Sequence, residues 1–85
     1  MTHEVQPEGE LFGRCLRDVR LRRKMTQHSL AEVAGMSEIY ISNMENGLKV
    51  PSLTTIIRLA LALDCKVRDL VGVFDKTDLR SIVPK

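Results

Sequence analysis

The chain has 85 residues, of which 44% are hydrophobic, and its formal net charge is only +2. A chain of this length forms one small domain and buries roughly 60% of the surface of its unfolded state. No apolar run reaches the roughly 18 residues of a membrane span, and the first ten residues do not resemble a secretory signal. We therefore expect a soluble, cytoplasmic protein without a membrane partner.

The residue types argue against cofactor and enzyme chemistry. Cys15 and Cys65 lie far apart, without a CxxC motif or a histidine at metal spacing, so zinc is not expected. Free buried thiols are favoured over a disulfide because nothing indicates export. There is no paired acid constellation, activated nucleophile or phosphate loop. We expect no cofactor, no metal, no small-molecule ligand and no catalysis, in an all-α fold whose core contains mainly Leu, Ile, Val and Ala.

The first 24 residues divide into a leader and a helix. Residues 1–9 lack periodicity and contain both proline and glycine, which predicts a flexible leader. Residues 10–24 place Phe12, Leu16 and Val19 at i, i+4 and i+7, as on one face of a helix. The other faces of this helix are rich in arginine, whereas residues 25–48 contain no Lys or Arg.

Residues 26–47 predict two short helices joined by a sharp turn. Thr26 is an N-cap residue before a helix with apolar members on one face, namely Leu30, Ala31, Val33 and Ala34. Gly35 supplies the positive φ that ends this helix. Ser37 caps a second helix, residues 37–46, with Ile41 and Met44 facing inward. This pattern indicates a helix-turn-helix.

The remaining residues predict two more helices and an arm. After the Asn46-Gly47 turn, Ser52 caps a strongly apolar helix with inward members Leu53, Ile56, Ile57, Ala60 and Leu63. Val67, Leu70 and Val71 indicate a short fifth helix. Residues 73–85 contain too many apolar residues for a solvated tail, but their spacing matches neither helix nor strand. We interpret them as an arm that contacts a dimer partner or another protein.

Several of these residues together resemble the phage-repressor family of transcriptional regulators, the Cro/cI or Xre class. They are Gln27, Ala31, Gly35, Ser37, the run Tyr40-Ile41-Ser42 and the run Glu45-Asn46-Gly47. The resemblance covers about residues 11–72. It implies a compact five-helix, lambda-repressor-like domain over residues 10–72 that binds a double-stranded DNA operator as a homodimer, most often as a repressor.

On this resemblance, the helix at residues 37–46 reads the DNA major groove. Helical spacing turns five of its residues outward as base-reading candidates, namely Ser37, Glu38, Ile39, Ser42 and Asn43. Members of the family often have Gln or Arg where Glu38 stands. A carboxylate near phosphate is repelled unless it meets a cytosine amine or a cation, so Glu38 either reads a base or excludes wrong sequences by its charge.

A second set of residues is expected to contact phosphates. It comprises Arg14, Arg20, Arg23, Gln27, Tyr40, Asn46 and Lys49. Neutralising backbone charge is the main sequence-independent source of DNA affinity. The alternatives are a solvated basic helix, simple packing of the tyrosine and an ordinary Asn-Gly turn.

The family resemblance also implies an ion pair between Arg20 and Glu45, which join the first and third helices. The alternative is two independent surface charges. A different function stays open as well, because the proposed reading helix lacks Lys and Arg. The fold could instead serve as a protein-interaction module, such as an antitoxin-like or anti-repressor partner.

Overall fold

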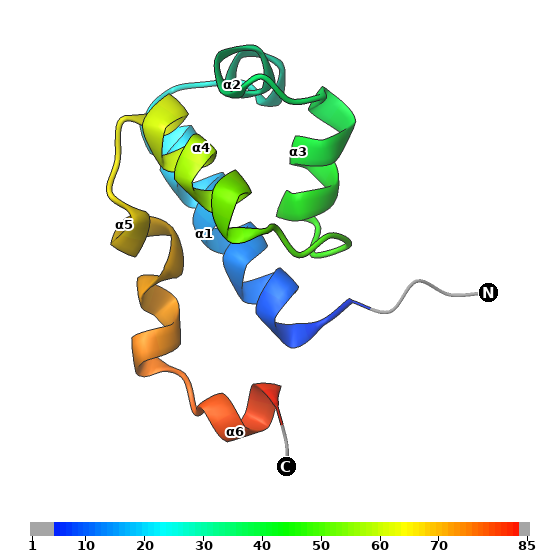
Figure 1. Cartoon of the computed structure of the whole chain (residues 1–85), viewed down its shortest axis with the longest axis vertical. Coiled ribbons are helices and arrows are strands. Elements are labelled where there is room, and N and C mark those ends of the chain that lie inside the picture. Colours follow the sequence, from blue (N-terminus) through cyan, green and yellow to red (C-terminus); the bar gives the residue numbers. More distant parts are fainter. Residues whose placement is uncertain (1–4, 84–85) are drawn as a thin grey trace, which may run out of the picture.

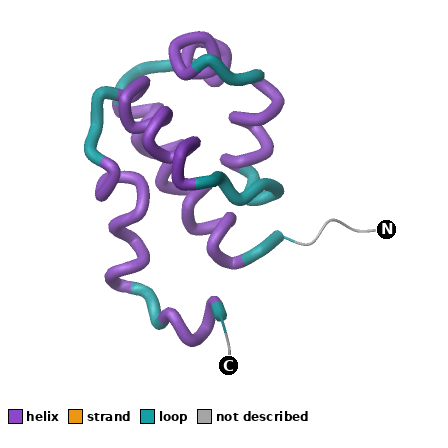
Figure 2. Tube along the Cα trace, in the orientation of Figure 1, coloured by secondary structure: helices purple, strands orange, loops and turns teal. Residues whose placement is uncertain are grey.

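Every regular element in the described part of this computed structural model, residues 5–83, is helical. The helices in chain order are α1 (Pro7–Arg22), α2 (Gln27–Ala34), α3 (Glu38–Glu45), α4 (Leu53–Leu63), α5 (Val67–Val71), the 3-10 helix η1 (Gly72–Lys76) and α6 (Leu79–Ile82). Figure 1 shows α1 crossing behind α4, with α2 and α3 at one end and α5 to α6 along the other side. Figure 2 shows how short the connections are.

Helix α1 begins three residues earlier than predicted. Pro7 occupies the first helical turn and Glu8 lies in that turn, where a fixed φ and a negative charge favour helix initiation. Gly9 is buried because the helix passes close to the Gly47 carbonyl. The predicted leader is therefore wrong for residues 7–9, whereas residues 1–4 lie outside the described residues.

The predicted caps determine where α2, α3 and α4 begin. Ser29 N donates to Thr26 Oγ1 over 3.0 Å, and Thr26 N donates to Ser29 Oγ over 2.9 Å, which forms a capping box. Tyr40 N donates to Ser37 Oγ over 3.0 Å, and Thr55 N donates in the same way to Ser52 Oγ. These caps satisfy backbone donors that would otherwise lack partners at each helix start.

The core lies where α1, α2, α3, α4 and α5 meet. Its fully buried side chains are Leu16, Leu30, Ile41, Met44, Leu59, Leu63 and Leu70. The inward positions predicted for α1 and α3 are confirmed, because Phe12, Leu16, Val19, Ile41 and Met44 are all buried. Within the described residues, no buried side-chain nitrogen or oxygen lacks a hydrogen-bond partner.

Two predictions of which helix face is buried were wrong. Val33 was placed on the inner face of α2 but is 63% exposed, since Leu30, Ala31 and Ala34 form the buried face. On α4, Leu53 and Ile57 were placed inward but are exposed, whereas Leu59, Ala60 and Leu63 are buried. An all-round apolar helix has no polar face to mark its outside, so its periodicity alone does not select the buried side.

The C-terminal segment is more ordered than its spacing indicated. Residues 72–76 form η1, and α6 follows with Asp78 as its N-cap, where Arg80 N donates to Asp78 Oδ1 over 3.1 Å. The five α-helices predicted between residues 10 and 72 are present, and α6 is an additional sixth. The four-residue length of α6 explains why no helical repeat was visible in the sequence.

Candidate DNA interface

Helices α2 and α3 lie at a wide angle over a short turn, with α3 along one edge of the molecule (Figure 1). The turn depends on Gly35, whose φ of 70° lies in the left-handed region that glycine adopts without strain. Met36 N donates to the Ala31 carbonyl and Gly35 N to the Glu32 carbonyl, which closes α2. The arrangement leaves one long side of α3 free of contacts with the core.

The free side of α3 carries the predicted base-reading residues. Ser37, Glu38 and Ile39 are exposed, and Ile39 is 74% exposed although it is apolar. Ser42 and Asn43 are half-buried. Ile41 and Met44 anchor the opposite side in the core with no exposed surface. The helix thus presents hydroxyl, amide, carboxylate and methyl groups, which are the groups that read base edges.

The turn after α3 places two predicted phosphate contacts at its outer end. Asn46 is the exposed C-cap, and Lys49 is exposed two residues beyond Gly47. Gly47 has a φ of 78°, and Leu48 N donates to the Asn43 carbonyl over 2.9 Å. This left-handed glycine ends α3 sharply, so Asn46 and Lys49 follow directly beside α3.

Glu45 joins the first three helices. Arg20 Nε donates to Glu45 Oε2 over 2.6 Å, and Arg20 Nη2 donates to Glu45 Oε1 over 2.9 Å. Gln27 Nε2 donates to the same Oε1 over 3.1 Å. The Arg20 and Glu45 side chains are only 10% and 3% exposed, so the ion pair predicted from the family resemblance is present and buried. These contacts of Glu45 fix the position of α3 relative to α1 and α2.

Arg20 is therefore not available as a phosphate contact. Its remaining nitrogen, Nη1, donates to the Met25 carbonyl over 2.8 Å, so all three of its nitrogens have partners. Hydrogen bonding to Glu45 raises the pKa of Arg20, and the guanidinium stays charged. The phosphate role predicted for Arg20 is corrected to an internal one. The side-chain Nε2 of Gln27 is bound to Glu45, so the phosphate contact predicted for Gln27 would have to come from its other atoms.

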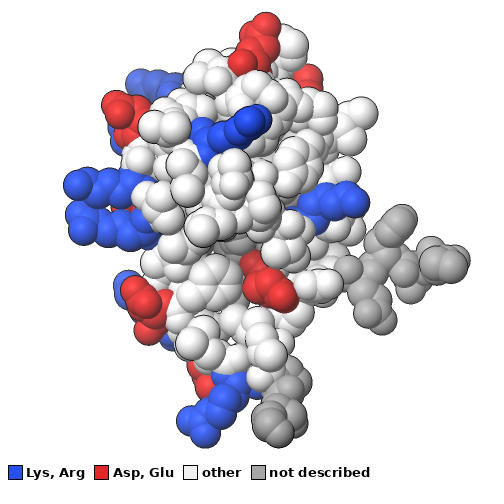
Figure 3. Space-filling model, viewed as in Figure 1, with Lys and Arg blue, Asp and Glu red and all other residues white. Residues whose placement is uncertain are grey.

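Two other arginines predicted to contact phosphate, Arg14 and Arg23, form contacts within the molecule. In Figure 3, Lys and Arg gather mainly along the edge that carries α5 and α6 in Figure 1. Arg14 Nη2 pairs with Glu10 Oε1 over 2.7 Å, and Arg23 Nη2 donates to the Asp64 carbonyl over 2.7 Å. Both arginines are exposed, and their phosphate contacts remain predictions.

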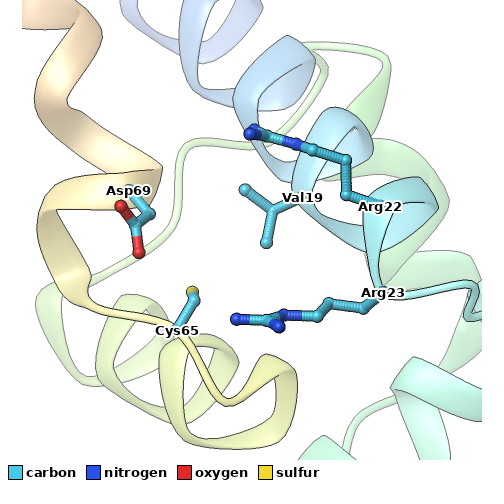
Figure 4. Close-up of a pocket in the computed structure, with 5 residues that line it drawn as sticks. All are labelled: Val19, Arg22, Arg23, Cys65 and Asp69. Atoms are coloured by element: carbon cyan, nitrogen blue, oxygen red, sulfur yellow. The ribbon is translucent and has the colours of Figure 1, made fainter.

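Arg23 also lines a depression of about 270 Å³ between α1 and the segment that leads into α5. Its lining residues are Val19, Arg22, Arg23, Cys65 and Asp69 (Figure 4). Burial and the nearby Asp69 carboxylate raise the pKa of Cys65, and burial with Asp18 raises the pKa of Cys15. Both thiols are free and stay protonated at neutral pH, so they are poor nucleophiles.

Tyr40 is half-buried and packs against the core, which supports the packing role that was one of its two predicted roles.

His28 was not identified as a site residue from the sequence. It projects from α2 toward the first turn of α3, where Nδ1 lies 3.3 Å from Glu38 Oε1. Its spacing of four to Glu32 was visible in the sequence, whereas the approach to Glu38 depends on the turn at Gly35.

The comparisons with known proteins agree with this geometry. The family model described as helix-turn-helix matches residues 16–70. The chain is 47% identical over 55 residues to the HTH-type transcriptional repressor RghR of Bacillus subtilis, covering 64% of this chain and 41% of that protein. The chain spans between 41% and 63% of the length of three curated relatives that it matches.

Two crystal structures are similar to this one. The restriction-modification controller protein C.AhdI from Aeromonas hydrophila has a TM-score of 0.71 at 35% identity, covering 73% of this chain and 94% of that one. The clp gene regulator ClgR from C. glutamicum has a TM-score of 0.75 at 27% identity, covering 91% and 95%. The larger overlap with ClgR must include part of residues 73–85. In the range 5–83, no helix is long and apolar enough to cross a membrane.

Proposed function

The chain belongs to the Cro/C1-type helix-turn-helix family of transcriptional regulators, and from this membership we propose that it represses transcription by binding an operator in double-stranded DNA as a homodimer. The observation that carries the proposal is the outer side of α3, which is free of the core and lined by groups that read bases. Ser37, Glu38, Ile39, Ser42 and Asn43 read the major groove.

Phosphate contacts come from both ends of the motif. Lys49 and Asn46 follow α3 directly and lie against the DNA backbone, and Gln27 at the start of α2 adds a third contact. Arg14 and Arg23 extend the positive charge along α1. Because α3 itself has no Lys or Arg, these flanking groups supply most of the sequence-independent affinity.

The dimer forms through an exposed apolar stripe on α4. Leu53, Ile57 and Leu61 follow one another at intervals of four and are 69%, 45% and 77% exposed. Exposed Val33 from α2 lines the same shallow depression as Leu61. An apolar surface of this kind is typical of a protein-protein contact. A two-fold dimer places two copies of α3 at half-sites about 34 Å apart.

DNA binding is tested by titrating a labelled operator, obtained by selection from a random DNA pool, over a range of salt concentrations. We expect affinity to fall steeply with added salt. Ser42→Ala and Asn43→Ala should each reduce discrimination between the operator and its base variants by about 1 to 3 kcal/mol. Lys49→Ala should weaken all sequences alike and reduce the salt slope by about 1.

Lys49 is the matched control for this comparison because it is exposed and makes no side-chain hydrogen bond within the described residues, whereas the Gln27 amide is bound to Glu45. If the two sets of variants behave alike, the division into reading and positioning residues is wrong. If no DNA is retained even at low salt, the DNA-binding proposal fails, and the fold serves as a protein-interaction module instead.

The dimer surface is tested with Leu61→Asp. We expect this variant to sediment as a monomer and to bind the full operator about 100-fold more weakly, because the second half-site no longer gains from the first. Thermal stability of the fold should change little, since Leu61 is 77% exposed. Leu21→Asp, at a 53% exposed position on α1, is the control and should remain a dimer. If the Leu61→Asp protein is still a dimer, the apolar stripe on α4 is not the dimer interface.

A further inference from the structure

His28 lies between two carboxylates from different helices. Its Nδ1 is 3.3 Å from Glu38 Oε1 on α3, and its Nε2 is 3.6 Å from Glu32 Oε1 on α2. These are the charged groups within ion-pair distance of the ring among the described residues. A neutral imidazole has only one N–H, whereas the protonated ring has one at each nitrogen. The geometry therefore suits an imidazolium that faces both acids at once.

The Glu38 carboxylate is electrostatically unfavourable in a helix that enters a DNA groove. It lies in the first turn of α3, on the same exposed side as Ile39 and Ser42, and phosphates repel an unpaired negative charge there. A protonated His28 offsets that charge and holds Oε1. The other oxygen, Oε2, remains to accept a hydrogen bond from the N4 amine of a cytosine.

We propose that His28 is the positioning residue that lets Glu38 read a cytosine. This inference rests on the proposed DNA-binding function. The same pair decides between the two roles of Glu38: beside a cation at residue 28 it reads a base, and without that cation its charge opposes binding. The side chains of His28 and Glu38 are 67% and 54% exposed, so the pair matters in the complex and contributes little to folding.

The sign of the effect follows from the charge. A cation at residue 28 offsets the Glu38 charge, so His28→Gln should bind the operator about tenfold more weakly than the unchanged protein at constant salt and pH. His28→Arg should bind at least as tightly as the unchanged protein, because its cation is permanent. His3→Gln, which removes the other histidine of the chain, should bind like the unchanged protein.

A second measurement identifies the base. Selection from a random DNA pool should give one position at which cytosine is required by the unchanged protein and by His28→Arg. Glu38→Gln and His28→Gln should both lose that requirement. Thermal unfolding of every variant should be nearly unchanged, which separates a binding effect from a loss of structure.

The outcomes separate this inference from the function on which it rests. If the unchanged protein selects no DNA, the proposed function fails. If it selects an operator but His28→Gln keeps the affinity and the cytosine requirement of the unchanged protein, the function stands and this inference is overturned. If His28→Gln weakens binding equally when Glu38 is already replaced by Gln, the inference is also overturned, because His28 would then act on phosphate directly.

Discussion

Replacing Glu45 with alanine is expected to lower the free energy of unfolding by about 3 to 5 kcal/mol. The substitution removes the acceptor of two Arg20 hydrogen bonds and leaves a guanidinium that is only 10% exposed without its counter-charge. It also removes the partner of Gln27 Nε2. A domain of this size has a total stability of only about 5 to 15 kcal/mol, so urea denaturation should show a large fall in the midpoint.

The matched control is Arg14→Ala. Arg14 and Glu10 also form an ion pair, but their side chains are 70% and 51% exposed, so the expected loss is only about 0.3 to 0.5 kcal/mol. Replacing both members of the buried pair, as in Arg20→Met with Glu45→Leu, should recover most of the stability because neither charge is stranded. If Glu45→Ala costs no more than Arg14→Ala, the pair does not hold the helices together.

The second large effect is expected for Gly13→Ala, at the crossing of α1 and α3. A Cβ atom built at residue 13 would lie 2.4 Å from the Met44 carbonyl oxygen and 2.6 Å from the Glu45 carbonyl oxygen. Both atoms are backbone, so no side-chain rotation relieves the overlap and the two helices must separate. We expect a loss of about 3 kcal/mol or more in the free energy of unfolding, measured by urea denaturation.

Operator affinity should fall as well, because the displaced backbone is the last turn of α3. Gly72→Ala is the control: nothing lies within 4 Å of the Cβ position, and φ is −62°. That change should be neutral or stabilise the fold by about 0.4 to 1 kcal/mol, through lower entropy of the unfolded chain. A Gly13→Ala protein as stable as Gly72→Ala would mean that α1 and α3 pack less closely than described.

The limits of each helix in the motif were predictable because local chemistry sets them. Thr26, Ser37 and Ser52 act on backbone groups within three residues, and Gly35 and Gly47 end their helices through their own φ angles. Such short-range signals can be read from the chain without knowledge of its packing. Residues 7–9 were missed because proline and glycine were interpreted as loop signals, although proline also favours the first helical turn.

The candidate site was less predictable, because it depends on which helices meet. The sequence marked α3 as the predicted reading helix, and the family resemblance pointed to Arg20 and Glu45 as a pair. Their contact removes Arg20 from the predicted phosphate set. His28 had no visible partner on α3 until the turn at Gly35 brought Glu38 to 3.3 Å from its ring.

By itself, the sequence determined the two helices of the motif, their caps and the turn between them, because these depend on neighbouring residues along the chain. Only the tertiary structure decided which sides of α2 and α4 are buried, leaving Val33, Leu53, Ile57 and Leu61 exposed. It also decided which charges are internal. Burial and ion pairing depend on contacts between residues far apart in the sequence. An apolar helix or a run of arginines has the same local pattern whether a neighbour covers it or not.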